Sequence, residues 1–107
     1  MTIREEDIER ACEWLVSNAE ECAQARADRV ALEEGRKHLK AIIMKEHTDL
    51  PLGAQEREAY ADPRYKTHLD GLREAVYKDE KLRYLRSAAE TKVEVFRTIC
   101  ANARGLR

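Results

Sequence analysis

The fold of this chain depends mainly on one long segment, residues 63–104, which reads PRYKTHLDGLREAVYKDEKLRYLRSAAETKVEVFRTICANAR. The segment is preceded by Asp62, a good N-cap residue, and begins with Pro63, which suits the first helical position. No other proline follows, and apolar residues recur at intervals of three and four, the period of a helix face. We therefore expect one continuous helix over 63–104, about 60 Å long at the rise of an α-helix.

The apolar positions of this long helix change register partway along it. Its first half carries them at 65, 69, 72 and 76, and its second half resumes at Leu82 rather than at Asp79 or Arg83. A slip of one residue rotates the buried face by about 100°. We expect the first half to pack on a helix over 30–47 and the second half to pack on the N-terminal helix.

Three helices are expected before this segment, and they cover about 3–16, 18–47 and 54–61. Thr2 with Glu5 predicts the cap of the first helix. Ser17 and Asn18 favour a break before the second helix, because both residue types prefer caps to helix interiors. One uninterrupted helix from residue 3 to 47 remains the alternative. Pro51 ends the second helix.

The composition is typical of long helices. Charged residues make up 38% of the 107 residues and hydrophobic residues 43%, whereas glycine and proline together number six, four and two respectively. Gly35, inside the second helix, is expected to allow close approach of another helix. We expect an all-α fold in a single domain over 1–107, an elongated antiparallel helical hairpin or coiled-coil-like bundle with a short N-terminal helix.

The charge is balanced overall and segregated locally. A net charge of −1 argues against bulk attraction to nucleic acid or to an anionic membrane. Residues 1–24 carry seven acids and two bases, a net −5, and residues 81–107 carry seven bases and two acids, a net +5. These two ends are expected to attract each other, within one chain or between two chains.

Several apolar residues lie outside the main helical stripes, among them Val16, Leu32, Tyr77, Tyr84 and Val95. A second copy of the chain could bury them, and paired long helices favour two-fold dimers, so we expect a homodimer. The expected partner-binding seam lies on the long helix and consists of Leu82, Leu85, Ala89, Val93, Phe96 and Ile99.

Two further surfaces are candidates for binding. The connection between the long helices could be a docking tip, or it could simply close the end of the bundle; its residues are Leu50, Leu52, Tyr60 and Tyr65. The basic C-terminal half could contact nucleic acid, although interspersed acids favour an ordinary solvated face; the candidate residues are Arg83, Arg86, Lys92, Arg97 and Arg104.

No catalytic, cofactor or metal site is expected. Cys12, Cys22 and Cys100 have no metal-ligand spacing and sit in alanine-rich or apolar surroundings, so reduced, packed cysteines are expected. The three histidines form no Glu-x-x-His motif, and the glycines are isolated rather than grouped in a phosphate-binding loop. Because no catalytic motif is present, we expect a protein that is not an enzyme. The chain has no apolar signal segment and no run of membrane-spanning length, so we expect it in the cytoplasm.

The stretch from Leu50 to Tyr65, with Ala25-Arg26-Ala27 and Ala88-Ala89-Glu90, resembles a family of small uncharacterised all-helical proteins of phages and prophages. The resemblance covers most of the chain and implies an accessory role beside phage recombination and replication genes, in the host cytoplasm. It carries over no site residues.

The expected function is therefore that of a non-enzymatic helical protein that binds itself and another protein. One alternative is a nucleic-acid-binding accessory protein that uses the basic C-terminal half. Another is a small phage inhibitor of a host defence or polymerase system.

Overall fold

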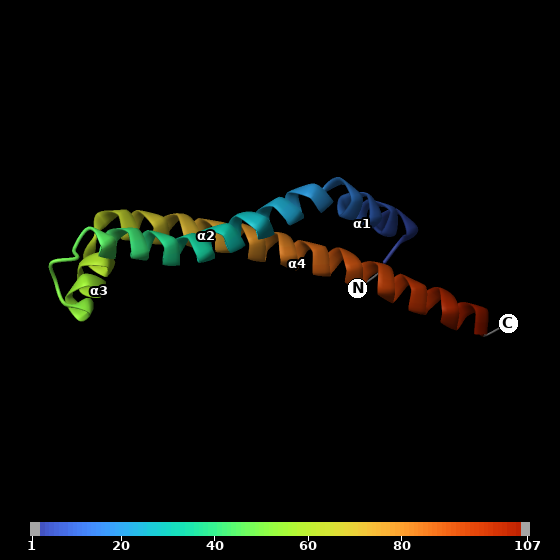
Figure 1. Cartoon of the computed structure of the whole chain (residues 1–107). Helices are drawn as coiled ribbons and strands as arrows, with labels where there is room; N and C mark the ends of the chain where they lie inside the picture. Colours follow the sequence, from blue (N-terminus) through green and yellow to red (C-terminus); the bar gives the residue numbers. More distant parts are fainter. Residues whose placement is uncertain (1–2, 106–107) are drawn as a thin grey trace. The chain divides into compact units, whose positions relative to one another are not determined.

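The computed structural model describes residues 3–105, and about 90% of these residues are helical. Its four helices are α1 (Glu5–Ser17), α2 (Ala19–Lys45), α3 (Leu52–Ala61) and α4 (Pro63–Gly105) (Figure 1). Every helix end lies within two residues of the range expected from the sequence. No strand occurs in the described part of the chain, which confirms the all-α class.

The chain consists of two compact units. The first unit comprises residues 1–23 and 80–107, and the second comprises residues 24–79. Helix α1 lies wholly in the first unit and α3 in the second, whereas α2 and α4 contribute residues to both.

The break expected near residue 18 is present, so the N-terminal region forms two helices rather than one. The backbone N–H and the side-chain amide of Asn18 both donate to the Trp14 carbonyl oxygen, at 2.9 and 3.0 Å, and these bonds close α1. The Asn18 carbonyl then accepts the N–H of Cys22, which starts α2.

Asp7 caps the start of α1. The Asp7 carboxylate accepts the backbone N–H of Arg4 at 3.0 Å. The predicted cap at Thr2 lies outside the described residues.

In the second unit, α2 and α4 run in opposite directions, with α3 at the end where they are joined (Figure 1). Arg64, at the start of α4, pairs with Glu46 just after α2 ends. Further along, Asp79 of α4 pairs with Arg29, ten residues after α2 begins. The first half of α4 therefore packs on α2, as its apolar pattern predicted.

The core of the second unit is small and lies near α3. Ile43, Ala59 and Tyr65 form a buried cluster, one from each of the three helices, with Leu39 and Met44 packed beside them. Ile43 is the one large side chain that is completely buried among residues 3–105.

The predicted change of register along α4 is wrong. Most of its buried and half-buried residues follow at intervals of three, four or seven through both units; they are Tyr65, His68, Leu72, Ala75, Asp79, Leu82, Ala89, Val93, Phe96 and Cys100. Gly71, Val76 and Glu80 are half-buried beside this series. Leu69, which the sequence pattern placed on the buried face, is 36% exposed. The error has a physical cause: two polar residues, His68 and Asp79, occupy buried positions that the apolar pattern assigned to other residues.

His68 can occupy this position because α2 has a glycine opposite it. The His68 imidazole Nε2 lies 2.7 Å from the carbonyl oxygen of Leu32. A carbonyl oxygen can only accept, so Nε2 carries the hydrogen. A Cβ at Gly35 would lie 3.2 Å from Cε1 of the same ring. The expected close approach at Gly35 is thus confirmed.

Asp79 is buried at 7% exposure and is paired across the two helices. Its carboxylate accepts a hydrogen bond from the Arg29 guanidinium at 3.1 Å, and Arg29 also donates to Glu33 at 3.0 Å on its own helix. A charge pair of this kind stabilises little in net terms, but the loss of one partner leaves the other charge buried without its counterion.

We predict different effects on the free energy of unfolding for two glycine substitutions. Gly71→Ala meets no atom within 4 Å and should raise the free energy of unfolding by about 1 kcal/mol, the usual gain in helix propensity. Gly35→Ala should bring no such gain, because its methyl group would press on His68. Urea denaturation at one fixed protein concentration measures both. In a His68→Ala background Gly35→Ala should regain the advantage, and a gain already in the wild-type background would contradict the contact.

The Arg29–Asp79 pair predicts a strongly non-additive mutant cycle. Arg29→Leu alone should cost about 3 kcal/mol, because it removes the guanidinium that faces a buried carboxylate. Combining it with Asp79→Leu should cost clearly less than the single change, since no buried carboxylate is then left without its guanidinium. Additive losses in chemical denaturation would show that the two groups do not depend on each other.

Candidate functional site

The candidate docking tip is only partly available for binding. Tyr65 is 7% exposed and belongs to the core, so its assignment to a docking surface is wrong. Its ring meets the ring of Tyr60 edge to face, with centroids 5.3 Å apart, and Lys40 lies over Tyr60 at 4.8 Å. Leu50 is half-buried, whereas Leu52 is 67% exposed. Leu52 and Tyr60, which is 54% exposed, are therefore the residues of this tip that remain accessible.

A group of ion pairs fixes the start of α4 in this region. The Arg64 guanidinium donates to Glu46 and to Asp62, and the Asp62 carboxylate also caps α4 by accepting the backbone N–H of Arg64 at 2.8 Å. The hydrogen bonds from Arg64 lower the pKa of Asp62 below its ordinary 3.8 and the pKa of Glu46 below its ordinary 4.5. These contacts hold a turn together and form no reaction site.

The predicted partner-binding seam is largely used inside the first unit. Leu82 and Ala89 are buried at 8% and 7% exposure, and Val93 and Phe96 are half-buried. Leu85 and Ile99, by contrast, are 44% and 50% exposed. Leu82 and Ala89 are thus covered within the protomer, and the role of the seam in binding a partner stays a prediction.

Alpha-helices α1 and α4 form a groove in the first unit. Ala11 and Ala89 make its buried floor. Its remaining lining comes from both helices: Asp7, Arg10 and Trp14 of α1, and Leu85, Ala88 and Lys92 of α4. We call this feature the α1–α4 groove. Small residues at its floor and a half-buried tryptophan at its wall suit the side chains of another helix.

The polar wall of the α1–α4 groove is ordered within the protomer. Arg10 donates to Asp7 at 2.6 Å. The backbone hydrogen bond from Arg4 lowers the pKa of Asp7 most, followed by the bond from Arg10, and the positive charge of Lys92 lowers it further. Asp7 of α1 and Lys92 of α4 therefore attract each other across the groove.

One face of α4 overlaps the edge of the groove and is exposed along its length. It consists of residues spaced four, three, four, three and four apart, all exposed: Lys81, Leu85, Ala88, Lys92, Val95 and Ile99. We call these six residues the outer stripe. The spacing is that of a heptad seam, which on a helix faces a second helix. The apolar pattern had assigned Leu85 and Ile99 to the partner-binding seam and left Val95 for a second copy, but it did not place Lys81, Ala88 or Lys92 on the same face.

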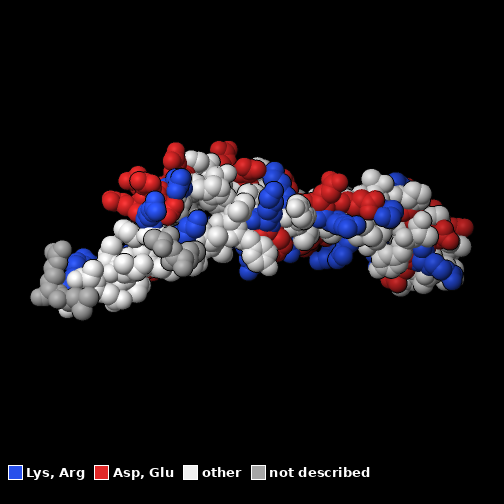
Figure 2. All heavy atoms as spheres, turned by 180° about the vertical axis from the view of Figure 1, so that it is seen from behind, with Lys and Arg blue, Asp and Glu red and all other residues white. Residues whose placement is uncertain are grey.

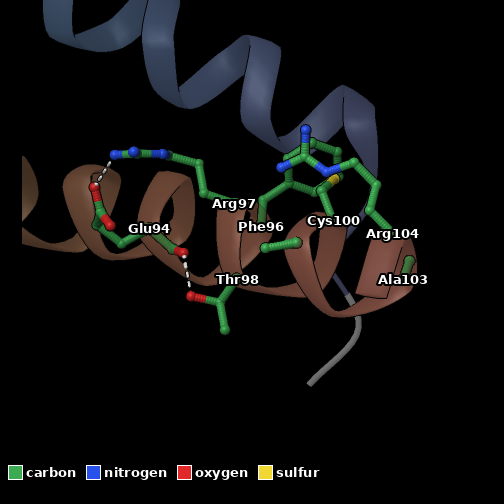
Figure 3. Close-up of a pocket in the computed structure, with 8 residues that line it drawn as sticks. Glu94, Phe96, Arg97, Thr98, Cys100, Ala103 and Arg104 are labelled. Atoms are coloured by element: carbon green, nitrogen blue, oxygen red, sulfur yellow. Dashed lines mark hydrogen bonds and ion pairs between the residues drawn. The ribbon is translucent and has the colours of Figure 1, made fainter. Parts of the chain in front are cut away.

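A second hollow near the end of α4 does not qualify as a small-molecule site. All its described lining residues belong to α4, so within residues 3–105 no second segment encloses it. Phe96 and Cys100 lie on the side of α4 that faces α1 (Figure 3). Arg97 is paired with Glu94 at 2.8 Å, and the Thr98 hydroxyl donates to the Glu94 carbonyl oxygen at 3.1 Å (Figure 3). Ligand pockets need concave walls that a single helix does not provide.

Most of the predicted nucleic-acid contacts already face acids. Arg83, Arg86 and Arg97 pair with Glu80, Glu90 and Glu94 at 3.6, 3.8 and 2.8 Å. Lys92 and Arg104 take part in no ion pair within residues 3–105. Paired arginines bind phosphate less well, since the attached carboxylate repels it.

The remaining chemistry is sparse. The described residues contain no cluster of three or more His, Cys, Asp or Glu side chains that could hold a metal ion. The three cysteines are free, and Cys12 is exposed. Within residues 3–105, none of the helices combines the length and apolar character needed to cross a bilayer.

The Arg64 ion pairs predict a defined pH dependence. Since both carboxyls have a lower pKa in the folded chain, their contribution to stability is complete above about pH 5 and is lost as the pH falls through the folded values. The difference in melting temperature between the wild type and Arg64→Gln should therefore shrink below about pH 4. Arg57→Gln, at an exposed position of α3, is the control. A difference that stayed constant down to pH 2 would contradict this assignment.

Comparisons with protein-family models, with curated proteins and with solved structures find no match to this chain. The α1–α4 groove and the outer stripe, both in the first unit, are therefore the candidate functional surfaces.

Proposed function

We propose that this chain is a non-enzymatic helical interaction protein, and that it works by pairing the outer stripe of α4 with a helix of another chain. The protein pairs with itself as a homodimer and, as an accessory factor, binds a further protein. The observation that carries the proposal is the outer stripe, a heptad-spaced face of which Leu85, Val95 and Ile99 are 44%, 37% and 50% exposed.

The small core of the protomer supports this proposal. Within residues 3–105 seven hydrophobic residues are buried, and four of these are alanines. A large aliphatic side chain contributes about 1.5–3 kcal/mol on full burial, and only Ile43 of the described residues reaches that state. Eleven large hydrophobic residues are exposed instead. Burial of some of them against a partner would add the stability that the protomer lacks.

Light scattering coupled to gel filtration tests the proposal. The wild type should elute at twice the 12.4 kDa of one chain, and Leu85→Glu combined with Ile99→Glu should shift it to a monomer. Both side chains are exposed, so the variant should keep its helical circular dichroism. Ser87→Glu introduces the same charge at an exposed position of α4 outside the stripe and should leave the dimer intact. A wild type that stays monomeric up to millimolar concentration would refute self-association.

The basic half of α4 favours one alternative, a nucleic-acid-binding accessory protein. The net +5 over residues 81–107 supports it, and the pairing of Arg83, Arg86 and Arg97 with acids weakens it. Low-salt gel shifts with the same protein samples separate the two functions. Binding of single- or double-stranded nucleic acid that Leu85→Glu with Ile99→Glu leaves unchanged would favour the alternative.

The link to phage DNA recombination and replication belongs to this proposal as the setting implied by the family resemblance. An inhibitor of a host defence or polymerase system would use the same kind of helical surface.

A further inference from the structure

We propose that the α1–α4 groove receives the outer stripe of a second copy of this chain, with the stripe's lysines, Lys81 and Lys92, against Glu6 and Glu13 of α1. This inference rests on the proposed function and identifies both partners of its homodimer contact. It assigns an acidic docking surface to α1, which the proposed function leaves unused.

The groove and the stripe are adjacent and share residues. Leu85, Ala88 and Lys92 line the groove and also belong to the stripe. A helix lying along the stripe therefore meets the groove wall formed by Arg10 and Trp14 of α1. Large side chains such as Ile99 on that helix match the small floor residues Ala11 and Ala89.

Helix α1 has an acidic flank beside the groove. Glu6 and Glu13 lie four residues before and three residues after Arg10, so they share the side of the helix on which Arg10 lines the groove. Both are exposed, and neither takes part in an ion pair among the described residues. Figure 2 shows acidic side chains gathered over α1, beside a C-terminal part of α4 with few acids.

The stripe itself is positively charged. It carries two lysines and no acid, and neither lysine forms an ion pair within residues 3–105. Lysine at a core position of a heptad seam destabilises the pairing unless its ammonium reaches an acid or water at the edge. If the two outer stripes of a dimer faced only each other, four lysines would come together. If each stripe faces the α1 flank of the other chain, its two lysines meet two glutamates.

A second copy is therefore a better occupant than an unrelated helix. Its stripe has both the apolar residues and the positive charges that the groove with its flank would bind. Two-fold symmetry makes each contact occur twice, because the stripe of each chain then lies in the groove of the other. The net −5 of residues 1–24 and the net +5 of residues 81–107 are thus neutralised between chains as well as within them.

Charge reversal in two separate variants tests the inference on the full chain. One variant carries Glu6→Lys with Glu13→Lys, and the other carries Lys81→Glu with Lys92→Glu. Each alone places like charges at both symmetric contacts and should weaken its own dimer about 100-fold at low salt, less at high salt. An equimolar mixture should form a heterodimer of near wild-type affinity, because both contacts then join opposite charges. Analytical ultracentrifugation of each variant and of the mixture measures this.

The matched control reverses two exposed charges of the second unit, Glu58→Lys and Arg73→Glu, which should leave the dimer unchanged. Circular dichroism confirms that each variant is folded, and the single changes Glu13→Lys and Lys81→Glu replace any double variant that is not. Recovery of the dimer on mixing supports the inference. Failure to recover, or variants that dimerise like the wild type, overturns it.

The outcomes also separate this inference from the proposed function. The wild type could form a dimer that Leu85→Glu with Ile99→Glu disrupts and that the charge reversals leave unchanged. That result would support the outer stripe as the dimer surface and would refute the groove as its binding site. A wild type that never dimerises removes both.

Discussion

Helix α4 has more surface than the other helices of this chain cover, and this constraint governs the rest of the structure. It is 43 residues long, whereas α1, its counterpart in the first unit, has 13 residues. A helix without a companion along its length is stable only if some other apolar surface packs on it. One face of α4 packs on α2 and α1, and the outer stripe lies beside that face, with Leu85, Ala88 and Lys92 at the edge of the α1–α4 groove. The outer stripe is the surface that we propose another helix covers.

Polar residues at buried positions define how the two helices of the second unit meet. His68 needs the carbonyl oxygen of Leu32 and the space above Gly35, and Asp79 needs the guanidinium of Arg29. Sliding one helix against the other would separate both pairs at once. An apolar seam would tolerate such a shift, since aliphatic contacts carry no direction. These polar contacts therefore select the alignment more than they add stability.

Charge plays a different role in the first unit. There Asp7, Arg10 and Lys92 lie on opposite walls of one groove, at the surface and open to water. Exposed ion pairs add little to stability, but they choose between partners and orientations. The acidic flank of α1 and the lysines of the outer stripe fit that role, since both remain available once the protomer has folded.

Local chemistry allowed the helices to be predicted. Helix ends depend on caps and breakers within a few residues, so Asn18, Pro51 and Asp62 marked them in the sequence without any knowledge of packing. The close approach at Gly35 was predictable for the same reason, because a glycine inside a helix weakens it unless a neighbour needs the space. The two exposed residues of the expected seam, Leu85 and Ile99, were also found from their spacing alone.

Only the tertiary structure decided which side of α4 is buried. Apolar spacing indicated a shift of register near Asp79, but burial of a charged or imidazole side chain depends on a partner many residues away, here Arg29 or Leu32. Such partners cannot be read from a period of three and four, because the period counts apolar residues and ignores hydrogen bonds between helices. The helices are thus a property of the local sequence, and their buried faces are a property of the contacts between them.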